Sequence, residues 1–277
     1  MNVASPMKTR TLTALVLAPL AIALILFVPT ALFAVITGAV FLYATWEWTR
    51  LLGLRAEAMR AGVVVLQAVA MVALWYARGG AIWWSVIAAG AAWWLIATLW
   101  LRRFSFGVAP TRENTALKLL VGALIVIPAW CGLLQVHAGA DRGPWWTLFG
   151  LMLVWVADSG AYLAGSRWGT TKLAPRISPG KTWAGVYGAL AASALVGVGG
   201  AWLLGLRGVA LAGIFVLAML TVIASIVGDL FESLIKRHAN MKDSGDLFPG
   251  HGGMFDRLDS VFAALPIWAA GLALLRT

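Results

Sequence analysis

The sequence contains little cysteine and little charge. Cys131 is the one cysteine among 277 residues, so the chain can form no internal disulfide and no metal site built from several thiolates. Charged residues make up only 12% of the chain, whereas 61% is hydrophobic and the mean hydropathy is +0.87. A soluble domain of this length would need far more polar surface. The composition therefore predicts a membrane protein that crosses the bilayer several times.

Other features that would indicate a different class of protein are also missing. The first apolar run is followed by no small-x-small cleavage site, so we expect a retained helix and not a removed signal peptide. No internal repeat, low-complexity linker or soluble domain is visible. The net charge of +10 is explained by Lys and Arg in cytoplasmic loops, so no nucleic-acid partner is expected.

About nine apolar runs are long enough to span a membrane, which takes about 20 residues per helix. The predicted fold is therefore an all-α polytopic membrane protein. The amino-terminal part, 1–110, holds the first four helices. The part predicted to be catalytic, 111–277, holds helices five to nine and cytoplasmic loops at 167–183 and 237–257. The expected spans are 12–28, 31–50, 61–78, 80–101, 116–136, 145–166, 184–205, 208–230 and 258–275.

The distribution of Lys and Arg predicts the orientation of these helices. Loops on one side of the predicted membrane hold all but four of the 21 basic residues, and cytoplasmic loops are the basic ones. The amino terminus is then cytoplasmic and, after nine spans, the carboxyl terminus lies outside. Size, tryptophan content and the missing signal favour a bacterial inner membrane. The four exceptions are Arg78, Arg142, Arg207 and Arg276.

Tryptophans lie mostly near the predicted helix ends, where amphipathic rings anchor at the membrane interface. Between two of them lies Glu47, in Trp46-Glu47-Trp48. We interpret Glu47 as a carboxylate at the cytoplasmic interface that pairs with Arg50, and not as a catalytic group.

Six of the eleven carboxylates fall within residues 225–259, interleaved with Lys236, Arg237, Lys242 and Arg257. Charges of both signs in one stretch of a membrane protein indicate a site for a charged substrate. The six are Asp229, Glu232, Asp243, Asp246, Asp256 and Asp259.

Two aspartates, Asp158 and Asp229, lie inside predicted spans. A charge at bilayer depth costs about 2.5–3.5 kcal/mol on insertion scales, so a functional role is favoured over a hydrogen bond that only joins two helices. Each aspartate belongs to a polar stripe with helical spacing. Two such stripes facing each other would enclose a polar pocket open to the cytoplasm. One stripe is Ser225, Asp229, Glu232, Ser233 and Lys236, and the other is Asp158, Tyr162 and Ser166.

Two loops have the composition of a phosphate site. Ser178-Pro-Gly-Lys-Thr182 offers backbone N–H groups, hydroxyls and one cation, although it lacks the upstream glycine and strand of a P-loop. A plain helix N-cap at Ser178 or Thr182 is the alternative. In the second loop, 249–253, glycines allow close backbone approach, and the carboxylates of Asp256 and Asp259 follow. Such oxygens bind Mg²⁺ together with substrate phosphates.

The second loop is part of a longer motif, Ser233-x2-Lys-Arg-x4-Lys-Asp-x-Gly-x2-Phe-Pro-Gly-His-Gly-Gly-Met-x-Asp-Arg-Leu-Asp259. At every defined position it resembles the signature of the phosphatidate cytidylyltransferase (CDP-diacylglycerol synthase) family. Segments 157–162 and 178–183 resemble the same family. The resemblance implies that CTP and phosphatidate react to give CDP-diacylglycerol and pyrophosphate. The nucleophile would be a lipid phosphate with a second pKa of about 6, which needs no general base.

This resemblance and the residue types together suggest roles. Mg²⁺ is expected on Asp229, Asp256, Asp259 and Asp158, with a second cation left open. Nucleotide phosphates are expected on Ser178, Lys181, Thr182, Gly252 and Gly253. Lys236, Arg237, Lys242 and Arg257 would neutralise phosphate charge, and Asp243 and His251 complete the predicted catalytic set. His251 would either protonate the leaving pyrophosphate or donate a hydrogen bond to a phosphate.

Two other functions remain open at this point. A CTP-dependent lipid kinase would release CDP, and its acceptor hydroxyl would need a base. A cation-coupled transporter would use Asp158 and Asp229 without any nucleotide. Small-residue patches such as Gly197-x-Gly199-Gly200 would pack helices either within the chain or across a homodimer.

Overall fold

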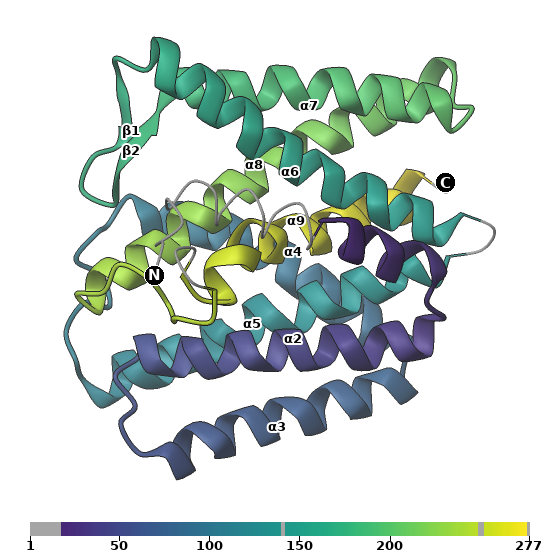
Figure 1. Cartoon of the computed structure of the whole chain (residues 1–277). Helices are drawn as coiled ribbons and strands as arrows, with labels where there is room; N and C mark the ends of the chain where they lie inside the picture. Colours follow the sequence, from purple (N-terminus) through teal and green to yellow (C-terminus); the bar gives the residue numbers. More distant parts are fainter. Residues whose placement is uncertain (1–17, 140–141, 249–251, 276–277) are drawn as a thin grey trace, which may run out of the picture.

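The computed structural model describes residues 18–139, 142–248 and 252–275 (Figure 1). Eight of the helices in these ranges are long and apolar enough to cross a membrane, and a shorter apolar helix covers Ala18–Phe27. The chain is therefore a polytopic membrane protein. The eight are α2 (Thr30–Leu51), α3 (Glu57–Tyr76), α4 (Ala81–Leu101), α5 (Arg112–His137), α6 (Gly143–Trp168), α7 (Trp183–Leu203), α8 (Gly208–His238) and α9 (Phe255–Leu275).

These helices begin and end close to the predicted spans, except for α8. Its membrane span was expected to end at residue 230, and the helix itself continues to His238, as the polar stripe that reaches Lys236 predicts. Its last two turns carry Glu232 and Lys236, which lower the hydropathy. They pair with each other, and Lys236 also pairs with Asp256 of α9. The first predicted span, 12–28, lies partly outside the described residues, and its described part is helical.

Successive helices run in opposite directions (Figure 1). The connections 52–56, 102–111 and 169–182 and the loop 239–248 gather at one end of the bundle, on the left of the figure. The connections 77–80 and 204–207 lie at the other end. The structure thus gathers the lysine- and arginine-rich connections at one end, which we call the basic end.

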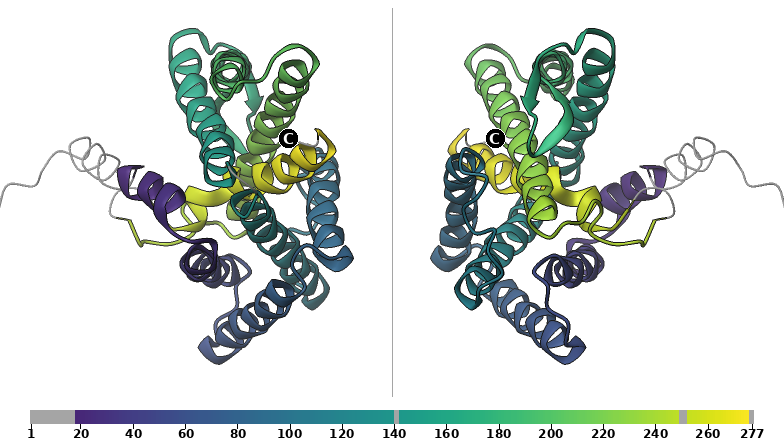
Figure 2. Two further views of the ribbon diagram at one scale, coloured as in Figure 1. Left: turned by 90° about the vertical axis from the view of Figure 1, so that its right-hand side faces the viewer. Right: turned by 90° about the vertical axis from the view of Figure 1, so that its left-hand side faces the viewer.

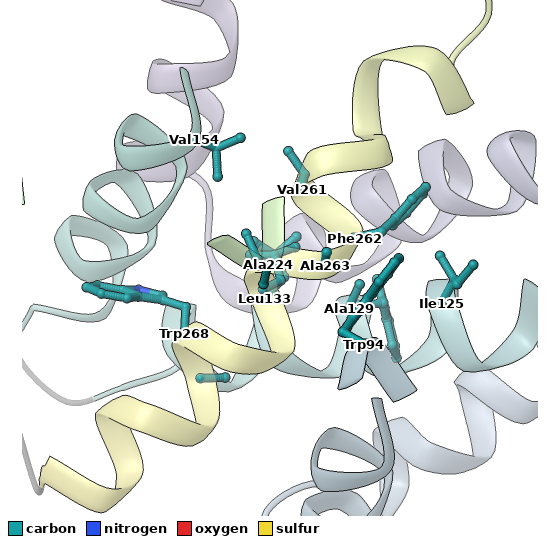
Figure 3. Close-up of a cluster of buried hydrophobic side chains, with 14 of the residues drawn as sticks. Trp94, Ile125, Ala129, Leu133, Val154, Ala224, Val261, Phe262, Ala263 and Trp268 are labelled. Carbon is teal, nitrogen blue, oxygen red and sulfur yellow. The ribbon is translucent and has the colours of Figure 1, made fainter. Parts of the chain in front are cut away.

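Helix α9 lies at the centre of the bundle, in contact with α2, α4, α5, α6 and α8 (Figure 2). Its Phe262 and Trp268 are fully or almost fully buried. Figure 3 shows them among side chains from other helices, including Trp94 of α4 and Val154 of α6. In contrast, α3 leaves most of its surface exposed. The core is therefore built around α9.

Close helix packing depends on small residues at two contacts, as is common in membranes. A Cβ added to Gly160 of α6 would lie 2.6 Å from the carbonyl oxygen of Gly188 on α7. Two glycines of the predicted small-residue patch also pack within the chain: a Cβ on Gly197 would contact Ala218, and one on Gly200 would contact Phe149.

The all-α prediction holds for the helices that are long enough to cross the membrane, but segment 167–183, predicted as a cytoplasmic loop, contains a short hairpin. Strands β1 (Lys172–Ala174) and β2 (Ser178–Thr182) form an antiparallel hairpin with Lys172 opposite Thr182. The stretch 178–182 is therefore a strand. Helix α7 follows it, and the Thr182 side chain accepts a hydrogen bond from the Gly185 N–H, as one of the two N-cap alternatives predicted.

Candidate active site

A pocket of about 580 Å³ opens near the basic end, between α6, α7, α8, α9 and the hairpin. The two predicted polar stripes contribute to it: Asp158, Tyr162 and Ser166 from α6, with Asp229, Glu232 and Lys236 from α8. Ser225 and Ser233, which share the α8 stripe in the sequence, do not line it. The expected polar pocket between two helices is thus present.

The pocket brings together most of the predicted site residues. Five do not line it: Ser178, Arg237, Lys242, Gly252 and Gly253. His251 lies outside the described residues. Those that line it are Asp158, Lys181, Thr182, Asp229, Lys236, Asp243, Asp256, Arg257 and Asp259.

Three carboxylates form the one group in the described residues whose geometry suits a metal ion. Asp229, Glu232 and Asp259 each offer an oxygen, and these oxygens lie within 4.8 Å of one another. Glu232 is 1% exposed, and its Oε1 accepts no hydrogen bond. Asp158 and Asp256, which were also predicted as ligands, do not belong to this group. Glu232 was absent from the predicted metal set, although its spacing from Asp229 on one helix face was visible in the sequence.

Gly228 allows this group to form. A Cβ at this position would lie 2.5 Å from the carbonyl oxygen of Asp259 and 2.8 Å from Ala263 Cβ. Because glycine lacks that atom, the backbones of α8 and α9 come close enough for Asp229 and Asp259 to face the same space.

Asp256, near the start of α9, is the centre of a hydrogen-bond network. Its Oδ1 accepts from Lys236 Nζ at 2.6 Å, and its Oδ2 accepts from the Gly253 N–H at 2.7 Å. The Ser244 N–H also donates to Oδ2 at 2.9 Å, and the Ser244 hydroxyl lies 2.9 Å from the same oxygen. This carboxylate therefore joins the loop to α8 and α9, whatever else it contacts during the reaction.

Two lysines pair with the pocket's carboxylates. Lys236 Nζ lies 2.8 Å from Glu232 Oε2 as well as 2.6 Å from Asp256. Lys181, carried in by strand β2, forms an ion pair with Asp229 of α8. The hairpin thus places a cation opposite the carboxylate group.

The pocket still carries an excess of negative charge. Six carboxylates line it, against two lysines and one arginine, which leaves a formal charge of −3 if all are ionised. Phosphate-bearing ligands would be repelled from such a surface. Cations bound beside such ligands would offset this repulsion.

The predicted residues outside the pocket have other partners. Arg237 donates from Nε to the Ile177 carbonyl at 3.2 Å, which connects α8 to the hairpin. Lys242 is exposed. Gly252 has φ +82°, and a Cβ there would lie 2.6 Å from Asp256 Oδ2. Gly253 donates its N–H to the same carboxylate. In this structure both glycines therefore pack on Asp256.

The predicted pairing of Glu47 with Arg50 was wrong. Arg50 pairs with Asp246, at 3.3 Å and on an exposed surface. Glu47 is buried and instead accepts hydrogen bonds from Ser244 Oγ and the Phe255 N–H. Nothing local in the sequence indicates these partners, because they lie about 200 residues further along the chain.

Residues 8–275 match the cytidylyltransferase family. A phosphatidate cytidylyltransferase of Pseudomonas aeruginosa is 42% identical, and the alignment covers 95% of this chain and 96% of the relative. One from Haemophilus influenzae is 35% identical over 95% and 97% of the two chains. One from Staphylococcus haemolyticus is 32% identical over 94% and 97%.

Proposed function

Because the chain belongs to the cytidylyltransferase family, its reaction joins CTP and phosphatidate into CDP-diacylglycerol and pyrophosphate, and we propose that this reaction takes place in the pocket between α6 and α9. A phosphate oxygen of phosphatidate would bond to the α-phosphorus of CTP as the bond from that phosphorus to the pyrophosphate oxygen breaks. The lipid phosphate is already an anion, so the pocket needs no general base.

The observation that carries this proposal is the pocket's combination of carboxylates and lysines at the basic end of a membrane protein. By the positive-inside rule that end faces the cytoplasm, where CTP would enter. The amino terminus would then be cytoplasmic and the membrane a bacterial inner membrane, with nine spans if residues 12–28 form one.

The carboxylate group fits magnesium. Mg²⁺ prefers carboxylate oxygens and shares its coordination with substrate phosphates. Asp229, Glu232 and Asp259 would hold it, and Oε1 of buried Glu232, which accepts no hydrogen bond, is available as a metal ligand. When bound, the ion would stabilise the negative charge that develops on the phosphates.

The basic residues of the pocket would bind the substrate phosphates and hold the carboxylates in position. Lys181 is held against Asp229 and can exchange this partner for a nucleotide phosphate. Arg257 lines the same pocket and offers a planar fork of N–H donors, which suits phosphate oxygens. Lys236 keeps Glu232 and Asp256 in place through its two ion pairs. Fixed charges of this kind bring two anions together and orient them.

The reaction is tested with detergent-purified protein, CTP, Mg²⁺ and phosphatidate, each omitted in turn. We expect pyrophosphate and CDP-diacylglycerol only when all three are present. Release of CDP with phosphorylation of a lipid alcohol would instead indicate a lipid kinase. Cation flux in liposomes without nucleotide would indicate a transporter.

The metal assignment is tested separately. Glu232→Gln and Asp259→Asn should raise the Mg²⁺ concentration needed for half-maximal activity by at least about tenfold, a loss of roughly 1.4 kcal/mol of binding. Glu57→Gln, which changes an exposed carboxylate outside the pocket, is the control. An unchanged Mg²⁺ requirement in both site variants would contradict the assignment.

A further inference from the structure

Glu47 is a buried carboxylate that the proposed mechanism does not use. It lies near the end of α2, is 3% exposed, and its Oε1 accepts no hydrogen bond. A buried carboxylate is costly unless its environment stabilises it. Its contacts therefore indicate what it stabilises.

The first contact is with the start of α9. Glu47 Oε2 accepts from the N–H of Phe255, the first residue of that helix, at 2.8 Å. The first N–H groups of a helix have no acceptor within the helix, and negative charge is favourable at this end. Glu47 thus acts as a cap for α9 that is supplied by a different helix. The adjacent Trp48 stacks on the Phe255 ring, with centroids 5.1 Å apart.

The second contact is with the loop that precedes α9. Ser244 Oγ lies 2.9 Å from the same Glu47 oxygen. Gly245 and Gly253 pack against the carboxylate so closely that a Cβ on either would overlap it. Positions 245 and 253 of the motif are therefore glycine in a place where the Glu47 carboxylate leaves no room for a side chain.

These contacts continue into the pocket. The Ser244 hydroxyl also lies 2.9 Å from Asp256 Oδ2. Its single hydrogen can serve only one of the two carboxylates at a time, but each has other donors: the Phe255 N–H for Glu47, and Lys236 and the Gly253 N–H for Asp256. A hydrogen-bonded path therefore runs from α2 through the loop to Lys236.

We propose that Glu47 is a positioning residue for the cytidylyltransferase reaction. It fixes both ends of the segment from Ser244 to Phe255 and, through Ser244, sets the orientation of Asp256 and Lys236. Glu47 itself does not line the pocket. This inference rests on the proposed location of the reaction.

The test compares Glu47→Ala and Glu47→Gln with the native protein under saturating CTP and phosphatidate. Alanine removes the acceptor, and we expect kcat to fall by roughly 100-fold, the effect of about 1 Å of misplacement at a reacting centre. Glutamine has the same shape, and its amide oxygen can accept from Ser244 and Phe255, so we expect most of the activity to return. Arg50→Ala removes an exposed ion pair to the same loop and is the matched control.

A double-mutant cycle separates positioning from general damage. If Glu47 acts through Ser244, then Glu47→Ala combined with Ser244→Ala should be no worse than the poorer single variant. Independent multiplication of the two losses would contradict the proposed path. Equal loss in the Gln and Ala variants of Glu47 would also contradict it, since the hydrogen-bond acceptor would then not be the important feature.

Amide hydrogen exchange tests the loop without any substrate. The N–H groups of Ser244, Gly253 and Phe255 should exchange at least about tenfold faster in Glu47→Ala than in Glu47→Gln. In the alanine variant the loop can open without breaking a hydrogen bond to residue 47, and a tenfold faster exchange corresponds to about 1.4 kcal/mol. Unchanged exchange would overturn the inference. If the native protein made no CDP-diacylglycerol while the exchange result held, the proposed function would fail and the role of Glu47 in holding the loop would stand.

Discussion

Replacing Lys236 with methionine would remove one ammonium group and leave the side chain nearly the same length. In the structure this ammonium lies between two carboxylates, 2.8 Å from Glu232 and 2.6 Å from Asp256. All three side chains are largely buried, with exposed fractions of 12%, 1% and 5%. Because these side chains are so little exposed, water can offset only part of the missing charge.

Breaking a buried ion pair by removing one partner costs about 3–5 kcal/mol, because the other charge stays buried. Asp256 keeps the N–H groups of Ser244 and Gly253 as donors, so the cost falls mainly on Glu232. At about 2 °C per kcal/mol for a chain of this size, the midpoint of thermal unfolding should fall by about 6–10 °C.

The measurement is thermal unfolding in detergent, followed by near-ultraviolet circular dichroism of the 16 tryptophans. Arg50→Met, which breaks an exposed ion pair, should change the midpoint by less than about 2 °C. The double variant Lys236→Met with Glu232→Met should recover at least half of the loss, because an apolar pair replaces both charges. It should remain inactive. A midpoint for Lys236→Met within about 2 °C of the native value would refute the reasoning.

Three further predictions concern the backbone contact, the nucleotide and the orientation. Gly228→Val should lower kcat by roughly 100-fold, since its side chain would push α8 away from α9 and separate the carboxylates; activity near normal would refute this close contact. Lys181→Ala should raise the KM for CTP about tenfold, a loss of roughly 1.4 kcal/mol, and leave the KM for phosphatidate unchanged; an unchanged CTP response would remove its assigned role. Cys131 is fully buried and should not react, so a membrane-impermeant thiol reagent added outside cells reports only on an introduced cysteine. It should label Arg142→Cys, on the predicted outer side, and not Arg55→Cys, on the predicted cytoplasmic side; the reverse pattern would show that the predicted orientation is wrong.

The helices and the polar pocket could be predicted because both depend on local periodicity. Asp158 and Asp229 were assigned to facing stripes from spacing alone, and the structure places both at one pocket. Glu232 was part of the same stripe, but only the approach of α9 shows that its carboxylate joins those of Asp229 and Asp259. Which carboxylates of a stripe meet is set by the crossing of two helices, and spacing along one helix does not contain that information.

Two features could not be predicted, one because its composition is not typical of a strand and the other because it depends on contacts between distant segments. Strands β1 and β2 are short, and the second contains Pro179 and Gly180, so their composition indicates a turn more than a strand. The partners of Glu47 come from the far end of the chain, and a nearby arginine offered a simpler pairing. For Glu47 a long-range contact determined the outcome, whereas the hairpin is a local structure that its composition does not indicate.

The central position of α9 has a consequence for biosynthesis. This helix follows all the other described helices in the chain, yet it packs against five of them and carries Asp256 and Asp259. As the ribosome delivers helices in order, α4, α5 and α8 must wait in the bilayer with the faces that will contact α9 still covered by lipid. The pocket can therefore be completed only after α9 has been inserted, and chains released before that point should accumulate as inactive substrates for membrane proteases.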